Sequence, residues 1–178
     1  MNRAPIVETL ARIEGLANEI NQHVPSDRPS LNEFRSDLAG LLTVTSCATY
    51  ENCVKLILQD YAGRQSNLFR VYAENQYDKI NSRIDIRDLH KYCKTFHPNI
   101  SRIFKDKLEK SKRFYLERAN SDITESYGQL LKWRHSFAHS GARITTVEEV
   151  LRHHQLGKRV IILFSDAFAE FPPSTPVT

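Results

Sequence analysis

Apolar residues recur at helical spacing from the start of the chain. Between residues 5 and 23 they fall three or four positions apart, which is the pattern of a helix with one buried face. This pattern predicts a first helix over residues 5–23 that ends before Pro25 and Pro29, because proline interrupts a helix. The expected core face of this helix consists of Ile6, Val7, Leu10, Ile13, Ala17 and Ile20.

The same periodicity predicts six further helical segments. Four of them cover residues 30–63, 66–80, 85–96 and 101–118. Asp85 can cap the segment at 85–96, and the last two segments are capped by Ser121 or Asp122 and by Thr146. A cluster of β-branched residues at 43–46 indicates a bend in the long second helix. Capping-box spacing occurs twice, in Ser30 with Glu33 and in Thr146 with Glu149.

Residues 160–164 admit two interpretations. The run Val160-Ile161-Ile162-Leu163-Phe164 has the composition of a buried strand, but apolar positions continue at 167 and 168, which favours a helix. Residues 30–97 and 99–171 contain no proline, which counts against a turn-rich sandwich or barrel. We therefore expect an all-α fold, an up-and-down bundle of about five to seven helices. The 178 residues fit one domain, which we place at residues 1–171, before a disordered tail at 172–178.

The composition limits the expected cellular compartment and the expected types of functional site. Three cysteines cannot all pair, which favours a reducing compartment, and no apolar run is long enough to span a membrane. Three glutamates in the first twenty residues argue against a signal peptide, so we expect a cytoplasmic protein. Gly-rich phosphate loops and a G-x-S-x-G motif do not occur. Cys93-x3-His97 and His153-His154 lack a second ligand pair, so we expect neither a metal nor another cofactor.

Positive charge is concentrated in the middle of the chain. Residues 64–118 hold fourteen Lys and Arg against seven Asp and Glu, whereas residues 1–63 hold five against eight. Aromatic residues interleave with the basic ones between 102 and 118, an arrangement that suits a phosphate backbone. The candidate RNA-binding residues are Lys105, Lys112 and Arg113. A solvated helix face is the alternative, because helix faces with mixed charges are common.

A polar cluster lies near the end of the helix that starts at 121. Residues 133–141 hold an arginine, two histidines and a serine next to a glycine. Arg134 shares a helix face with Tyr127, Leu130, Leu131 and Ala138, which we expect to be buried. His139 lies five residues later, about 140° further around the helix. In the plainest interpretation, Arg134 extends its charge to solvent while His139 caps the helix end before Gly141.

The run Arg134-His135-Ser136-Phe137-Ala138-His139 resembles the R-x4-H signature of HEPN domains, an all-α family of small ribonucleases and inactive relatives. A polar residue often follows the arginine in that family and alanine often precedes the histidine, as His135 and Ala138 do here. Glu51-Asn52-Cys53-Val54-Lys55 resembles an E-x3-K unit found in some HEPN branches, including the RiboL-PSP group. The resemblance implies a HEPN-like helical bundle with the R-x4-H motif late in the chain.

This resemblance also implies a reaction. HEPN ribonucleases work without a metal and use the 2′-hydroxyl of the RNA to attack the adjacent phosphorus. Arg134 would bind the scissile phosphate, and His139 would move the proton as general base or acid. His135, Glu51 and Lys55 would support this pair. On spacing alone, Glu51 and Lys55 are as well explained by an i,i+4 surface ion pair.

The family sets two copies of the motif across a twofold interface, so the resemblance implies a homodimer with a composite site. It also suggests a toxin or phage-defence effector that cleaves tRNA or mRNA and is restrained by an antitoxin or another regulatory protein. We expect no membrane partner. The leading alternative is a non-catalytic HEPN-like module that binds RNA, a nucleotide or a protein, because fold alone does not decide activity. A purely structural helical bundle is a third interpretation.

Overall fold

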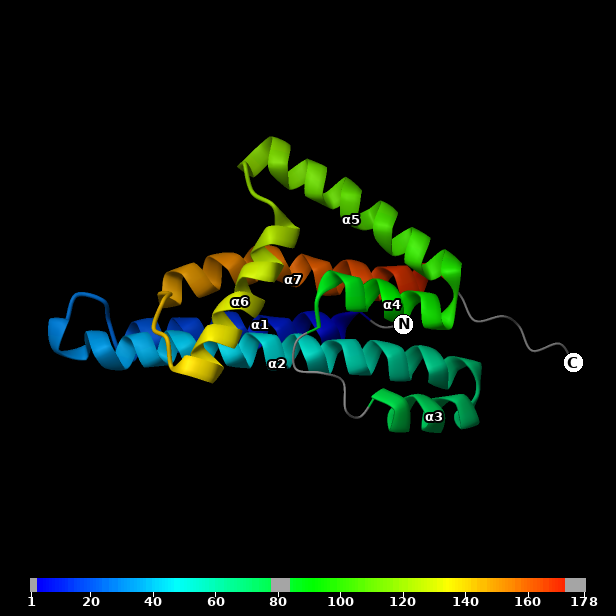
Figure 1. Cartoon of the computed structure of the whole chain (residues 1–178), viewed down its shortest axis with the longest axis horizontal. Helices are drawn as coiled ribbons and strands as arrows, with labels where there is room; N and C mark the ends of the chain where they lie inside the picture. The colour runs from blue at the N-terminus through cyan, green and yellow to red at the C-terminus, as the bar shows by residue number, and fades with distance from the viewer. Residues whose placement is uncertain (1–2, 78–83, 172–178) are drawn as a thin grey trace, which may run out of the picture.

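The structure is a computed structural model that describes residues 3–77 and 84–171. Within these residues it contains seven α-helices, one short 3₁₀ helix and no strand, which confirms the all-α prediction (Figure 1). None of these helices is long and apolar enough to cross a membrane. The elements are α1 (Ala4–His23), η1 (Pro29–Leu31), α2 (Asn32–Gln65), α3 (Asn67–Tyr77), α4 (Ile86–Phe96), α5 (Pro98–Ala119), α6 (Ile123–Ser140) and α7 (Val147–Glu170).

Three long helices form the body of the molecule. Helices α1, α2 and α7 contact one another and run along the long axis, and α6 crosses them while contacting α2 and α7 (Figure 1). Helix α3 folds back along α2, and α4 packs on the first part of α5. The C-terminal half of α5 stands away from the body, and most of its side chains after Leu108 are exposed (Figure 1).

The core contains a buried polar connection between three helices. The Tyr50 ring on α2 stacks on Tyr127 of α6, with ring centroids 5.4 Å apart. The Tyr50 hydroxyl lies 3.0 Å from Nδ1 of His154, and Nε2 of His154 lies 3.1 Å from the carbonyl oxygen of Leu10. A carbonyl only accepts, so Nε2 carries the proton and Nδ1 accepts from Tyr50. His154 therefore joins α1, α2 and α7 while uncharged.

The caps predicted at Asp85, Asp122 and Thr146 are confirmed, and the one predicted at Ser30 is wrong. Asp85 accepts the N–H groups of Arg87 and Asp88, and Thr146 forms the predicted capping box with Glu149. The capping box predicted at Ser30 does not form, because Pro29 starts a 3₁₀ turn and α2 begins only at Asn32. A residue inside such a turn lacks the extended backbone that an N-cap needs.

The start of α5 also differs from the prediction. It begins at Pro98 rather than at Ser101, since the first helical position has no N–H partner to lose and tolerates proline. The preceding residue, His97, accepts the N–H of Asn99 through Nδ1 at 3.1 Å and is the N-cap.

The second helix is not interrupted at residues 43–46, where a bend is predicted. Thr43, Thr45 and Ser46 donate their hydroxyl groups to the carbonyls four residues earlier, at 2.8–2.9 Å, and α2 runs through them to Gln65. Residues 160–164 are helical within α7, as the longer apolar pattern predicts. Residues 78–80 of the predicted third helix and the predicted tail at 172–178 lie outside the described residues.

Candidate functional site

The R-x4-H run occupies the last two turns of α6. Asp122 caps the start of this helix by accepting the N–H groups of Thr124 and Glu125. Gly141 ends it with φ of 63°, a left-handed conformation that glycine adopts without steric cost, and donates its N–H to the carbonyl of Phe137 at 2.9 Å. Arg134 and His139 are therefore held by one regular helix.

The last two turns of α6 pack against the first half of α2. Gly40 lets the Phe137 ring approach so closely that a Cβ at position 40 would lie 2.1 Å from ring carbons. The loop after the motif is also bound to α2, because Arg143 donates to Asp37 at 2.5 Å and to Glu33 at 2.6 Å. These two carboxylates raise the pKa of the Arg143 guanidinium. Both contacts fix the end of α6 against α2.

Gly40→Ala tests this close approach. We expect the free energy of unfolding to fall by about 1–2 kcal/mol, because the new methyl group forces the Phe137 ring out of its position. Gly128→Ala, on α6, is the matched control. Its added Cβ meets nothing within 4 Å, so the better helix propensity of alanine is expected to raise stability by about 0.5–1 kcal/mol. Urea denaturation measures both, and equal effects of the two variants would contradict this account.

Arg134 begins the last two turns of α6, on the side that packs against α2. Burial raises the pKa of the Cys47 thiol on α2 to about 12, and the positive charge of Arg134 opposes this rise. Arg134 is half-buried, while Tyr127, Leu130 and Leu131 on the same face are buried, as predicted. Among the described residues, the Arg134 guanidinium forms no hydrogen bond or ion pair, so its five N–H groups are available to a ligand.

The exposure of Ala138 differs from the prediction. This residue is exposed rather than buried, because the last turn of α6 lies at an edge of the molecule (Figure 1).

His139 points to solvent from this last turn. Its ring lies beside that of His135, one turn earlier, with centroids 4.4 Å apart, and both side chains are exposed. Within the described part of the chain His139 makes no hydrogen bond, so the structure does not record the helix-end cap considered as an alternative. Arg134 and His139 thus present their functional groups in different directions within one chain.

Glu51 and Lys55 form the i,i+4 ion pair, with Nζ 3.2 Å from Oε1. No hydrogen bond joins Glu51 to Arg134 or His139 in the described structure, whereas the charge of Glu51 contributes to raising the pKa of Tyr92 on α4. Glu51 nevertheless shares the α2 face of Gly40 and Cys47, at positions i+11 and i+4 relative to them. The unit therefore lies about one turn beyond the part of α2 next to Arg134.

The three candidate RNA-binding residues on α5 do not gather around the motif. Lys112 is paired with Asp122 at 2.9 Å, and this carboxylate raises its pKa. Arg113 is exposed on the outer half of α5. Lys105 lines a separate hollow between α4 and α5, together with basic residues of α4 that the sequence analysis missed. The signal was present in the spacing of Arg87, Lys91 and Lys94, which repeat at i, i+4 and i+7.

Cys93, His97 and His154, three of the candidate metal ligands, lie in the core or at a helix end. Cys47, Cys53 and Cys93 are free and buried. The Nδ1 atom of His97 is engaged as a helix cap, and His154 lies in the core. Within residues 3–77 and 84–171, no three His, Cys, Asp or Glu side chains are grouped closely enough to hold a metal ion.

Comparison with protein families gives one match. The family described as RiboL-PSP-HEPN matches residues 8–170, a span that contains both the E-x3-K unit and the R-x4-H run. Searches of curated proteins and of solved structures found no match. The matched span reaches from the first turns of α1 to the end of α7, so it takes in the whole helical arrangement. The chain therefore belongs to the RiboL-PSP-HEPN family.

Proposed function

We propose that this protein is a metal-independent endoribonuclease. The observation that carries the proposal is the state of the R-x4-H pair: the Arg134 guanidinium and the His139 imidazole lie in the last two turns of one well-capped helix, and neither forms a hydrogen bond or ion pair within the described residues. A structural arginine or histidine at a helix end would ordinarily satisfy a carbonyl or a carboxylate. These two groups are available to a substrate instead.

The chemistry follows from the two side chains. One imidazole removes the proton from a 2′-hydroxyl, and the 2′-oxygen attacks the adjacent phosphorus while the bond to the 5′-oxygen breaks. The leaving oxygen takes up a proton, so the products are a 2′,3′-cyclic phosphate and a 5′-hydroxyl. The Arg134 guanidinium binds the phosphate oxygens and stabilises the negative charge that grows on them. His135, whose ring neighbours His139, orients that imidazole or moves the second proton.

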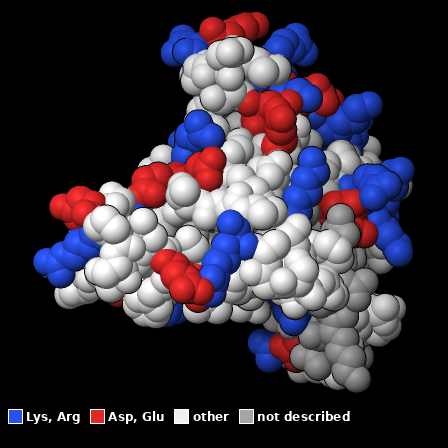
Figure 2. Space-filling view, turned by 60° about the vertical axis from the view of Figure 1, so that its left-hand side comes forward, with Lys and Arg blue, Asp and Glu red and all other residues white. Residues whose placement is uncertain are grey.

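A homodimer brings the two groups to one place. Within one helix Arg134 and His139 point about 140° apart, whereas a twofold axis beside α6 sets the arginine of one copy opposite the histidine of its partner. Apolar side chains next to the motif support such an interface: Phe34, Leu41 and Ile144 are 54%, 52% and 55% exposed. Figure 2, which turns this end of the molecule forward, shows broad areas without charged residues between isolated acidic and basic ones. Burying the exposed apolar side chains of such a surface favours association.

The proposal includes a biological role for the protein. A cytoplasmic toxin or phage-defence effector that cleaves tRNA or mRNA, restrained by a protein partner, fits the family. The second candidate is a non-catalytic module that binds RNA, a nucleotide or a protein. One observation favours it: the catalytic pair does not converge within a single chain.

A metal-free cleavage assay separates the two candidates. Purified protein is incubated in excess EDTA with an RNA and with the same sequence carrying 2′-O-methyl groups. We expect cleavage of the RNA alone, with 2′,3′-cyclic phosphate ends, because the methylated control lacks the attacking hydroxyl. Cleavage of both substrates would contradict the mechanism, and binding without cleavage of either would favour the module.

A further inference from the structure

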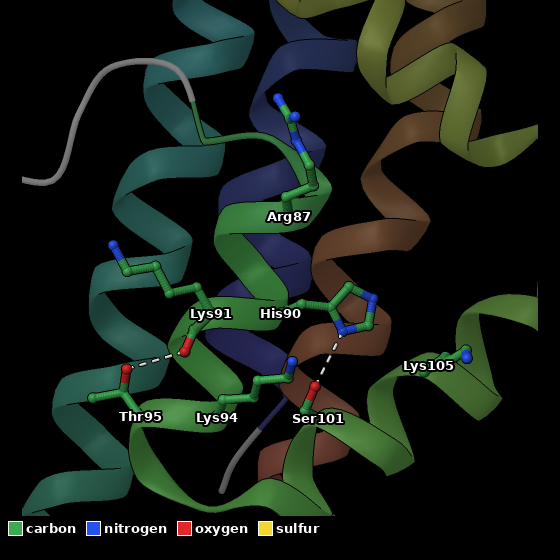
Figure 3. Close-up of a pocket in the computed structure, with 7 residues that line it drawn as sticks. All are labelled: Arg87, His90, Lys91, Lys94, Thr95, Ser101 and Lys105. Atoms are coloured by element: carbon green, nitrogen blue, oxygen red, sulfur yellow. Dashed lines mark hydrogen bonds between the residues drawn. The ribbon is translucent and has the colours of Figure 1, made fainter.

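A hollow between α4 and α5 is lined almost entirely by side chains that bind anions. Its volume is about 740 Å³, and it opens to solvent on the side of the molecule shown in Figure 3. Arg87, Lys91 and Lys94 line it from α4, and Lys105 lines it from α5, with their charged ends pointing in different directions around the space (Figure 3). In Figure 1, the α4–α5 junction and the C-terminal end of α6 lie in opposite halves of the molecule, so the hollow is separate from the R-x4-H run.

The positive charge of the hollow is not neutralised within the described chain. Arg87 pairs with Asp85 at 2.8 Å, but Lys91, Lys94 and Lys105 form no ion pair with any described residue. No Asp or Glu is among the described residues that line the space. Positive charges that line one open hollow without an acidic partner there repel one another. An anionic ligand would relieve this repulsion. Binding of such a ligand would explain why basic residues gather at the hollow.

Two neutral groups on the inner wall add specific hydrogen bonds. The Nδ1 atom of His90 lies 3.2 Å from the Ser101 hydroxyl, and the other ring nitrogen has no hydrogen-bond partner among the described residues (Figure 3). Burial, Lys94 and Lys105 lower the pKa of His90, which shows that the field of the lysines reaches this wall. Ser101 is in the first turn of α5, where the helix dipole also favours negative charge.

We propose that this hollow binds the phosphodiester backbone of RNA. Lysines act as point charges on phosphate oxygens without selecting a base, as backbone binding requires. The space is larger than one phosphate group and open, which suits a strand that passes through it. The inference rests on the proposed function in that RNA is the substrate: the hollow would hold the same RNA at a distance from the cleaved bond.

Binding of an uncleavable RNA tests this site independently of catalysis. The probe is a fluorescent 2′-O-methyl 20-mer, and its anisotropy is measured between 50 and 200 mM salt. For Lys94→Gln/Lys105→Gln we expect affinity at least about tenfold weaker than wild type and a salt dependence shallower by about 1–2 phosphate contacts. Both lysines are exposed and unpaired, so the variant is expected to fold with unchanged or slightly higher stability.

Arg12→Gln/Arg28→Gln is the matched control, because it removes the same charge from two exposed arginines that form no ion pair within the described residues. We expect its affinity for the 20-mer to stay within about twofold of wild type. Equal weakening by both pairs, or no weakening by the lysine pair, would overturn the site. Displacement of the 20-mer by equimolar ATP would overturn the assignment to an RNA backbone and favour a nucleotide. Because no arm needs cleavage, an inactive protein would refute the nuclease without affecting this result.

Discussion

Replacing His139 with alanine is expected to lower the rate of RNA cleavage about 1000-fold. The imidazole is assigned the proton transfer, and loss of a general acid or base ordinarily costs about 10²–10⁴ in rate. His139 is exposed and makes no hydrogen bond in the described structure, so the variant is expected to unfold at the same urea concentration as wild type. Arg134→Ala is expected to cost a similar factor, because the negative charge developing on the phosphate oxygens then lacks its partner.

Mixing these two inactive variants tests whether the site is shared between copies. Half of the dimers in an equal mixture combine an intact arginine from one chain with an intact histidine from the other. We expect the mixture to recover about a quarter of wild-type activity, since each mixed dimer keeps one of two productive pairs. Sedimentation velocity confirms that both variants still dimerise. An inactive mixture of dimers would contradict the shared site, and retention of most activity by His139→Ala would contradict the catalytic assignment.

Acidification is expected to destabilise the fold through His154. Burial lowers the pKa of this imidazole from 6.5 to about 4 in the folded protein, with Lys158 adding to the effect. Between pH 6.5 and 4 the unfolded chain therefore binds more protons than the folded one. The contribution to stability is complete above pH 6.5 and is lost as the pH falls to 4, by about 3 kcal/mol at 1.36 kcal/mol per pKa unit.

Urea denaturation at pH 7 and pH 4.5, for wild type and His154→Gln, isolates this effect. The glutamine does not titrate, so the loss of stability on acidification is expected to be smaller in the variant. His139→Gln is the control for an exposed histidine and is expected to follow wild type. His90 and His153, whose pKa values burial also lowers, contribute in the same direction in all three proteins. An equal loss in wild type and His154→Gln would show that His154 is not the sensor.

The helices are predictable from the sequence because their signals are local. Apolar spacing and the capping groups Asp85 and Thr146 act within a few residues of the chain, and the structure confirms them. The two errors in where a helix begins concern prolines at the first helical position. Pro29 and Pro98 can begin a helical turn as well as precede one, and the sequence pattern does not distinguish these uses.

The site is predictable in part. The R-x4-H run is contiguous, so its residues and their helix were visible in the sequence, as was the family. The packing of the motif against α2 could not be predicted from the sequence. Gly40 contacts Phe137, and Arg143 contacts Asp37, only after α2 and α6 pack together. The same holds for the α4–α5 hollow, which brings Lys105 of α5 together with Arg87, Lys91 and Lys94 of α4.

The burial of all three thiols has a practical consequence for work on the assembly. Cys47, Cys53 and Cys93 lie inside the folded chain, so thiol reagents have no ready target on its surface. A single cysteine introduced at an exposed position such as Ala138 would be the one accessible attachment point for a spin label or fluorophore. Pairs of such labels would report the separation of two α6 helix ends in solution, with the native cysteines left in place.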